Sequence, residues 1–139
     1  RSPIGRKNRN QHDCGKIMIT IKKIDPKRLD ERGSIYELLI RPTKHVYVMH
    51  RKAGTISGDH YHLGNIASKS PETFYVVSGK VRLVVRNIDT DEKETHELGE
   101  NTFLQIPARI HHQFIALTDF SFLEFNVDHE DFEKDTVKS

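Results

Sequence analysis

Short apolar runs, each ended by a turn signal, recur along this chain at roughly eight- to twelve-residue spacing. Residues 17–24, 34–40 and 45–50 are rich in β-branched or alternating apolar side chains, and Asp25-Pro26 ends the first run because proline cannot donate a ladder hydrogen bond. Roughly nine or ten such strands are expected, and no amphipathic helix of normal length is indicated. This pattern predicts a single-domain, all-β fold, either an antiparallel sandwich or a barrel.

Two pairs of these runs are separated by short turn sequences, which predicts two hairpins. In the first, residues 73–77 and 81–86 flank a turn in which Gly79 supplies the positive φ. In the second, residues 112–116 and 120–126 flank a short polar turn.

The composition narrows the setting of this domain. At 139 residues the chain is long enough for one domain with a real core, and no apolar run is long enough to cross a membrane. Its single cysteine, Cys14, excludes an intrachain disulfide, and we therefore expect a reducing, cytoplasmic setting.

The basic charge of the chain is concentrated in residues 1–17, which carry five Lys or Arg side chains against one acid, Asp13. Such a tail can contact nucleic acid or an acidic surface, but we interpret it as a disordered leader because the apolar patterning starts at about Met18. We therefore expect a tail at 1–17, a folded domain at 18–128 and an acidic tail or short helix at 129–139. No nucleic-acid binding is expected from the folded domain.

The stretch between Gly54 and Gly79 carries the side chains with the clearest chemical potential. His60 and His62 are two residues apart, so both project to one face of a strand, and Glu72 opens the next apolar run. The polar loop between them is long enough to overhang a site as a flap. Two imidazoles and a carboxylate can form half of a metal site or a general-base pair, and the alternative is two exposed histidines on an edge strand.

The order of these residues resembles the first motif of the cupin superfamily, in which a glycine, two histidines, a glutamate and a closing glycine follow one another. The second cupin motif is similar to the segment from Gly99 through Pro107 to His112, which makes His112 the third histidine of the site. The resemblance implies a small cupin jelly-roll β-barrel, in agreement with the strand pattern. Four features depart from the family pattern. The loop before Glu72 is longer, seven residues rather than the usual five separate Gly99 from Pro107, Arg109 stands where a glycine is common, and no asparagine follows His112 at the family distance.

A closer resemblance comes from residues 30–34 (DERGS), residues 45–48 (HVYV) and residues 58–62 (GDHYH). Together they look like the nucleotide-sugar cupins, which include dTDP-4-dehydrorhamnose 3,5-epimerases, 3,4-ketoisomerases and the metal-bearing cupin half of capsule-sugar reductases. The resemblance implies an isomerase or epimerase that acts next to a carbonyl on a nucleotide-activated or phosphorylated sugar. Ser57 stands where the metal-free groups typically carry an arginine.

Two mechanisms are compatible with these residues. Three imidazoles and one carboxylate suit one divalent transition metal, Zn, Mn, Fe, Co or Ni, which can polarise a substrate carbonyl. The expected metal ligands are His60, His62, Glu72 and His112. In the metal-free alternative, His60 or His62 removes a carbon-bound proton and Tyr47 or Tyr75 returns one, although both tyrosines also suit core packing.

Other functions and contacts remain open from the sequence. The same ligands suit an Fe-dependent dioxygenase, which would consume oxygen, or a non-catalytic module that binds a small polar ligand without exchanging protons. Glu124 shares a face with Phe120 and Phe122, so we expect it to enter the barrel and support a ligand histidine. The strand at residues 17–24 is a suitable edge for pairing with a second subunit, which predicts a homodimer.

Overall fold

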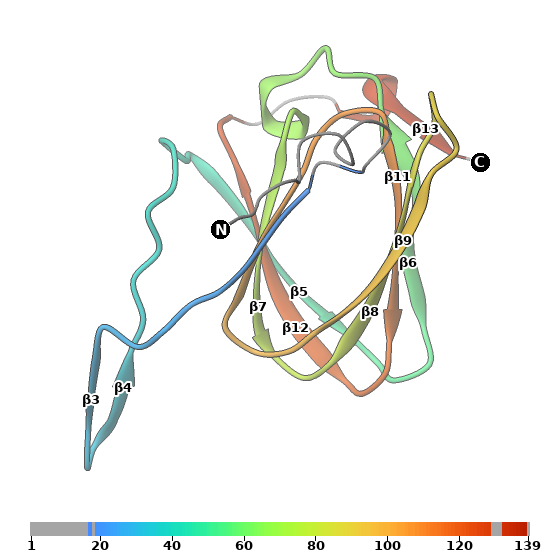
Figure 1. The fold of residues 1–139 in the computed structure, drawn as a ribbon. Helices are drawn as coiled ribbons and strands as arrows, with labels where there is room; N and C mark the ends of the chain where they lie inside the picture. The colour runs from blue at the N-terminus through green and yellow to red at the C-terminus, as the bar shows by residue number, and fades with distance from the viewer. Residues whose placement is uncertain (1–16, 18, 129–131, 139) are drawn as a thin grey trace, which may run out of the picture.

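The computed structural model of the chain describes residues 17, 19–128 and 132–138. It is a jelly-roll β-barrel in which two five-stranded sheets pack face to face, and this confirms the predicted all-β cupin fold (Figure 1). Most of the predicted basic tail, with Cys14 and Met18, lies outside the described residues. In the part of the chain that the structure describes, no helix is long and apolar enough to cross a membrane.

One sheet has the strand order β2-β10-β7-β12-β5, and the other has the order β13-β6-β11-β8-β9. The first sheet contains β2 Thr20–Lys23, β10 Thr102–Ile106, β7 Glu72–Ser78, β12 Phe120–Asn126 and β5 His45–Arg51. The second sheet contains β13 Thr136–Lys138, β6 Ile56–His62, β11 Ile110–Ala116, β8 Val81–Asn87 and β9 Lys93–Leu98. From β5 to β13, successive strands alternate between the sheets, except that β8 and β9 form a hairpin.

Both hairpins predicted from the sequence are wrong, because each turn carries the chain from one sheet to the other. β7 pairs with β10 and β12, whereas β8 pairs with β9 and β11. β11 and β12 likewise lie in opposite sheets. Turn residues specify that the chain reverses, but the sheet to which the next strand returns depends on partners far away in the sequence.

The interior of the barrel is apolar at one end and polar at the other. Strands β8, β10, β11 and β12 alternate buried and half-buried side chains, so every second residue faces inward. Along β12 the buried inward side chains run from Phe120 and Phe122 to Glu124 and Asn126. The aromatic end supplies the packed core that holds the strands in place beneath the polar end.

Two short segments extend beyond the barrel sheets predicted from the sequence. The hairpin of β3 (Arg28–Asp30) and β4 (Gly33–Ile35) projects away from the barrel, where a single strand at 34–40 was predicted (Figure 1). The 3-10 helix η3 (Phe132–Asp135) leads into β13, which pairs with β6. η3 lies in the segment where an acidic tail or short helix was expected, and β13 after it pairs with an edge of β6 that would otherwise be unpaired.

Gly79 is expected to be essential for the crossing from β7 to β8. Its φ is +87°, and a Cβ at this position would lie 2.1 Å from the carbonyl oxygen of Asp119. We expect Gly79→Ala to lower the free energy of unfolding by at least about 2 kcal/mol, through backbone strain and this clash, as measured by chemical denaturation. Gly99→Ala is the matched control, because a Cβ there meets nothing within 4 Å. Equal losses in both variants would contradict this account.

Candidate functional site

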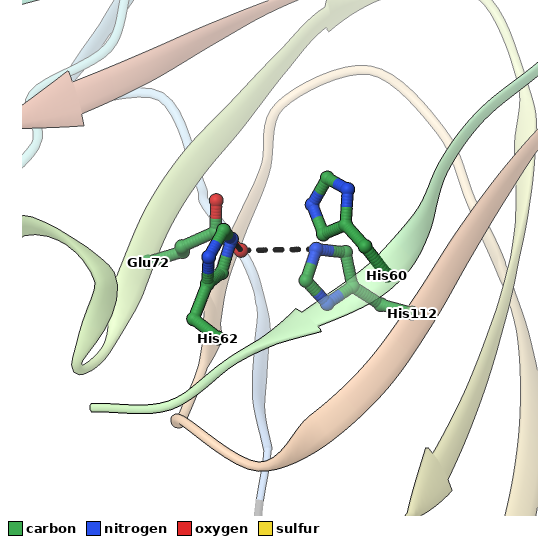
Figure 2. A group of neighbouring side chains, drawn as sticks. All are labelled: His60, His62, Glu72 and His112. Atoms are coloured by element: carbon green, nitrogen blue, oxygen red, sulfur yellow. Dashed lines mark ion pairs between the residues drawn. The ribbon is translucent and has the colours of Figure 1, made fainter. Parts of the chain in front are cut away.

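Three histidines and one glutamate converge inside the polar end of the barrel (Figure 2). His60 and His62 come from β6, His112 from the adjacent strand β11, and Glu72 from β7 in the facing sheet. Each residue offers one ligand atom, and these atoms all lie within 4.8 Å of one another. His112 stands opposite His60 in the β6–β11 register, so the three rings meet on one strand pair. The structure therefore brings together the four residues predicted as metal ligands.

A β-bulge at Gly58 and Asp59 shapes the strand that carries two of the histidines. The register pairs His112 with His60 and the next residue of β11 with Gly58, so Asp59 is the extra residue. Both bulge residues have positive φ, and a Cβ on Gly58 would lie 3.0 Å from the carbonyl oxygen of His112. The bulge shifts the alternation of side chains by one position, so Ser57 lines the same cavity as His60.

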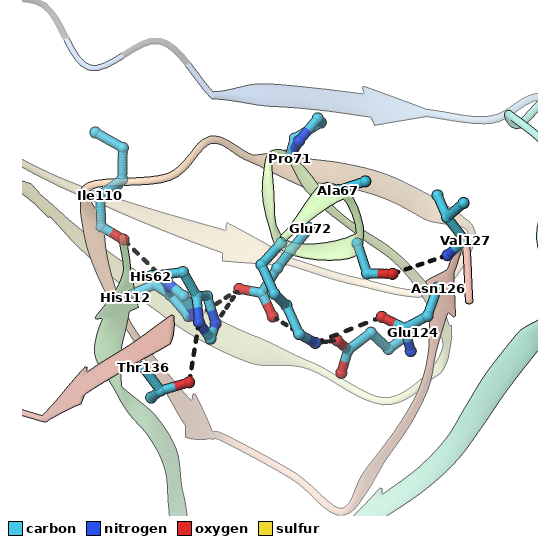
Figure 3. A network of polar contacts seen from close by, with 12 residues as sticks. His62, Ala67, Pro71, Glu72, Ile110, His112, Glu124, Asn126, Val127 and Thr136 are labelled. Atoms are coloured by element: carbon cyan, nitrogen blue, oxygen red, sulfur yellow. Dashed lines mark hydrogen bonds and ion pairs between the residues drawn. The ribbon is translucent and has the colours of Figure 1, made fainter. Parts of the chain in front are cut away.

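Hydrogen bonds on the far side of two rings orient them toward the glutamate (Figure 3). Nδ1 of His112 lies 3.1 Å from the carbonyl oxygen of Ile110, which can only accept, so this nitrogen carries the proton. Nδ1 of His62 lies 3.1 Å from the hydroxyl of Thr136 on β13. Nε2 of each ring faces Oε1 of Glu72, at 3.0 Å from His112 and 3.2 Å from His62. Such a partner on one ring nitrogen is typical of metal-binding histidines.

Two buried polar atoms at the centre of the cluster lack hydrogen-bond partners among the described residues. They are Nε2 of His62 and Oε1 of Glu72, which are 3.2 Å apart but do not have hydrogen-bond geometry. Buried polar atoms are nearly always paired, so converging lone pairs of this kind fit a cation between them. Two ligand atoms that each lie about 2.1 Å from one ion are at most about 4.2 Å apart. Ligand atoms of the cluster that are 4.8 Å apart would therefore have to approach each other by roughly half an ångström to bind the same ion.

The electrostatics of the cluster keep the glutamate ionised. Burial acts to raise the pKa of Glu72, but His112 and His62 outweigh it and hold that pKa well below its usual value. Burial acts to lower the pKa of His112, and here Glu72 outweighs it and raises that pKa. A buried carboxylate that stays charged at neutral pH is a ready partner for a cation.

A buried lysine that sequence reasoning missed completes the polar end of the barrel. Lys69 belongs to the 3-10 helix η2 (Ala67–Lys69) in the loop predicted to be a flap, and it is 3% exposed. Its ammonium group pairs with Glu124 and with Oε2 of Glu72, the latter at 3.5 Å. Glu124 enters the barrel as expected, but its partner is this lysine rather than a histidine. Loop residues follow no periodicity, so no pattern could point Lys69 inward.

A cavity of about 110 Å³ opens beside the cluster. Its polar wall contains Ser57, His60, Glu72, His112 and Glu124, and its apolar wall contains Met49, Phe74, Phe114 and Phe122. Arg51 of β5 lines the same cavity and is exposed to solvent. An apolar wall opposite a few convergent polar groups is the usual form of a small-molecule site.

The structure separates the two tyrosines predicted to return a proton. Tyr75 lies on the outer face of β7, where its hydroxyl donates to Oδ1 of Asn101 at 2.5 Å. The expectation for Tyr75 is corrected, because a residue three positions from Glu72 on one strand faces the opposite side. Tyr47 lies on the inner face of β5 and lines a smaller hollow beside Lys69. A role for Tyr47 stays a prediction.

Arg109 replaces the glycine that is common in the second motif, and its backbone adopts a conformation that glycine favours. Arg109 has φ +67°, a left-handed conformation that glycine adopts at lower cost. Its backbone N–H donates to the carbonyl oxygen of His62 at 2.8 Å, and its guanidinium lies 2.6 Å from Oδ1 of Asp89. The first contact ties the start of β11 to the end of β6, and the second ties it to the turn between β8 and β9. His111 lies on the outer face, with Nε2 3.1 Å from Oδ1 of Asp59.

In the metal-free protein, His60 is expected to titrate far below an ordinary histidine. Burial, and next the neighbouring His112, lower its pKa from 6.5 to about 4. Because the pKa is lower in the folded state, the unfolded chain binds more protons between these two values, and stability falls as the pH drops through that window. Histidine-selective NMR titration of chelator-treated protein measures the pKa, and a value near 6.5 would refute the expectation.

Comparisons with known proteins agree with the fold. The family described as "Polysaccharide biosynthesis C-terminal domain" matches residues 28–137. The sugar 3,4-ketoisomerase QdtA from Thermoanaerobacterium thermosaccharolyticum, solved with TDP, shares 18% identity at a TM-score of 0.69, with 87% of this chain and 88% of that chain covered. A 3,4-ketoisomerase from Helicobacter canadensis shares 17% identity at a TM-score of 0.73, with 88% and 92% covered.

A third similar structure is the dTDP-4-dehydrorhamnose 3,5-epimerase from Sulfolobus tokodaii, at 21% identity and a TM-score of 0.68. The alignment covers 85% of this chain and 74% of that chain. No curated protein matches the sequence. These likenesses establish the barrel fold, and the chemistry has to be argued from the residues of the cluster.

Proposed function

The chain belongs to the polysaccharide biosynthesis C-terminal domain family, and we propose that it is a metal-binding isomerase or epimerase. It would act next to a carbonyl on a nucleotide-activated or otherwise phosphorylated sugar. The observation that carries this proposal is the cluster of three histidines and Glu72, with unpaired buried atoms, on the wall of a cavity. Support for the substrate class comes from similar structures solved with TDP and with TDP-4-keto-6-deoxyglucose.

Four side chains would hold one divalent transition metal ion of the class Zn, Mn, Fe, Co or Ni. They are His60, His62, Glu72 and His112. When bound, such an ion supplies Lewis-acid polarisation of a substrate carbonyl, which acidifies the neighbouring C–H. The chain contributes the orientation of the rings, because Ile110 and Thr136 engage the far nitrogens of two of them. It also contributes a buried carboxylate charge and an apolar wall that limits access of water.

His60 is better suited to bind a metal than to act as a base. Its pKa of about 4, set by burial and then by His112, keeps the ring neutral and its lone pair free at neutral pH. A metal ligand must be unprotonated, whereas a general base works best when its pKa is near the operating pH. The metal mechanism is therefore the first candidate, and proton removal by His60 without a metal is the second.

The anionic part of the substrate has a candidate partner at the cavity. Arg51 is exposed on β5, lines the cavity and lies outside the metal cluster. A guanidinium can bind phosphate oxygens through two parallel hydrogen bonds. Ser57 occupies the position where the metal-free relatives usually carry an arginine, and Arg51 could take the place of that arginine. The buried hydroxyl of Ser57 has no hydrogen-bond partner among the described residues.

Proton exchange and metal content test the proposal together. Protein purified without a histidine tag is analysed for metal, then incubated in D2O with TDP-4-keto-6-deoxyglucose, and NMR follows deuterium at carbons next to the carbonyl. We expect one bound divalent ion and deuterium uptake, with a loss of at least about a hundredfold after metal removal or in His112→Gln. His50→Gln, at an exposed histidine hydrogen-bonded to Ser121, is the control and should leave uptake unchanged.

Other outcomes point to the rival functions. Full uptake after metal removal would support His60 as the base. Binding of metal and of the sugar nucleotide without any uptake would support a non-catalytic binding module. Oxygen consumption by the Fe-loaded protein, again without deuterium uptake, would support a dioxygenase.

We also propose that the protein is a homodimer that pairs through the outer face of the sheet containing β5. An apolar row crosses four strands of this face, because Val48 is opposite Leu123, Leu123 opposite Tyr75, and Tyr75 opposite Phe103. Val46 and Val48 are 42% and 64% exposed. Leu123 and Phe103 are half-buried and Tyr75 is buried, so the most exposed apolar side chains lie on the edge strand β5, which is a suitable site for contact with a second copy. At one edge of this sheet is β2, which matches part of the edge strand expected from the sequence.

Val48→Lys is expected to shift the protein from dimer to monomer, because it places a charge at the most exposed end of the apolar row. Sedimentation velocity at two concentrations measures the change. Ile56→Lys is the control, because Ile56 is 57% exposed on β6 in the other sheet. A wild-type protein that sediments as a monomer at both concentrations would rule out this interface.

A further inference from the structure

The long loop between His62 and Glu72 is tied to the barrel at several points. Nη2 of Arg41 donates to the carbonyl oxygens of Ala67 at 2.6 Å and Pro71 at 3.0 Å. The backbone N–H of Val127 donates to the hydroxyl of Ser68 at 3.0 Å. At the start of the loop, the buried carboxylate of Asp135 accepts backbone hydrogen bonds from residues 64 and 65. These contacts fasten the loop at residues other than Lys69.

This loop delivers one charged side chain into the barrel. The side chain of Lys69 is 3% exposed, and its ammonium group contacts Glu124, Oε2 of Glu72 at 3.5 Å and Oδ1 of Asn126 at 3.4 Å. Burying an ammonium group is costly unless charged and polar partners surround it. A buried ion pair is a weak source of stability, so a purely structural role leaves the presence of this lysine unexplained.

The two oxygens of Glu72 face different partners. Oε1 lies 3.0 Å from Nε2 of His112 and 3.2 Å from Nε2 of His62, whereas Oε2 faces Lys69. A free carboxylate can bind an ion through one oxygen or through both. A carboxylate with one oxygen engaged by an ammonium group presents only the other to the histidines.

We propose that Lys69 is a positioning residue that makes Glu72 a ligand through one oxygen. Lys69 holds Oε2 away from the histidines, and Glu124 and Asn126 hold Lys69 in place. The consequence is one fewer protein ligand on the ion, which keeps a coordination position open for substrate on the cavity side. This inference rests on the proposed metal binding by the cluster.

The Co2+-substituted protein tests this role, because the intensity of Co2+ d–d absorption falls as the coordination number rises. In Lys69→Met, which is uncharged and of similar length, Oε2 is released and Glu72 can bind through both oxygens. We expect about a twofold loss of molar absorption in the visible d–d bands, with one Co2+ still bound. Lys69→Met/Glu124→Leu removes the buried pair as a unit, leaves the net charge of the polar end unchanged and should show the same loss.

One control separates positioning from stability. Lys27→Met removes an exposed lysine paired with Glu37 on the outside and should keep the wild-type spectrum. If Lys69 only stabilises the loop, its variants will have a lower melting temperature and an unchanged Co2+ spectrum, and that result overturns the inference while leaving metal binding intact. A wild-type protein that binds no Co2+ overturns both.

Discussion

The polar end of the barrel depends on one constraint, which is the cost of keeping a carboxylate charged where water is excluded. Glu72 is 3% exposed, and an isolated ion at such a depth would be strongly destabilising. Each of its two oxygens therefore has a polar or charged partner. Oε1 faces Nε2 of His62 and of His112, and Oε2 faces the ammonium group of Lys69. The surrounding hydrogen bonds, loop contacts and strand pairings make this arrangement possible.

The barrel supports the cluster from below and from the sides. The lower interior is packed with aromatic rings, and Phe114 has its ring centroid 5.3 Å from that of Phe74 and 5.5 Å from that of Phe122. All the expected ligands lie on strands of this packed body rather than on loops, which holds them more precisely than a loop could. The bulge at Asp59 then sets which residues of β6 face the cavity.

Two segments outside the motif residues contact the polar end of the barrel. The long loop, which replaces a shorter connection in the cupin pattern, brings Lys69 into the barrel. The C-terminal segment adds β13 beside β6, places Thr136 behind His62 and uses the carboxylate of Asp135 to fasten the loop. Variation outside the motif residues therefore changes the immediate surroundings of the glutamate.

The sequence by itself determined the class of fold, most of the barrel strands and the inward set of histidines, because alternation along a strand has a fixed period of two and is a local property. The same alternation predicted that Glu124 faces inward. Applied to β7, it would have excluded Tyr75 from the site, because Tyr75 lies three residues from Glu72 and therefore on the opposite face. Only the tertiary structure decided that the predicted hairpins cross between sheets, that η3 continues into a strand, and that Lys69 is buried. These outcomes depend on contacts between residues far apart in the chain, such as Lys69 with Glu124 and Thr136 with His62, and no local pattern encodes them.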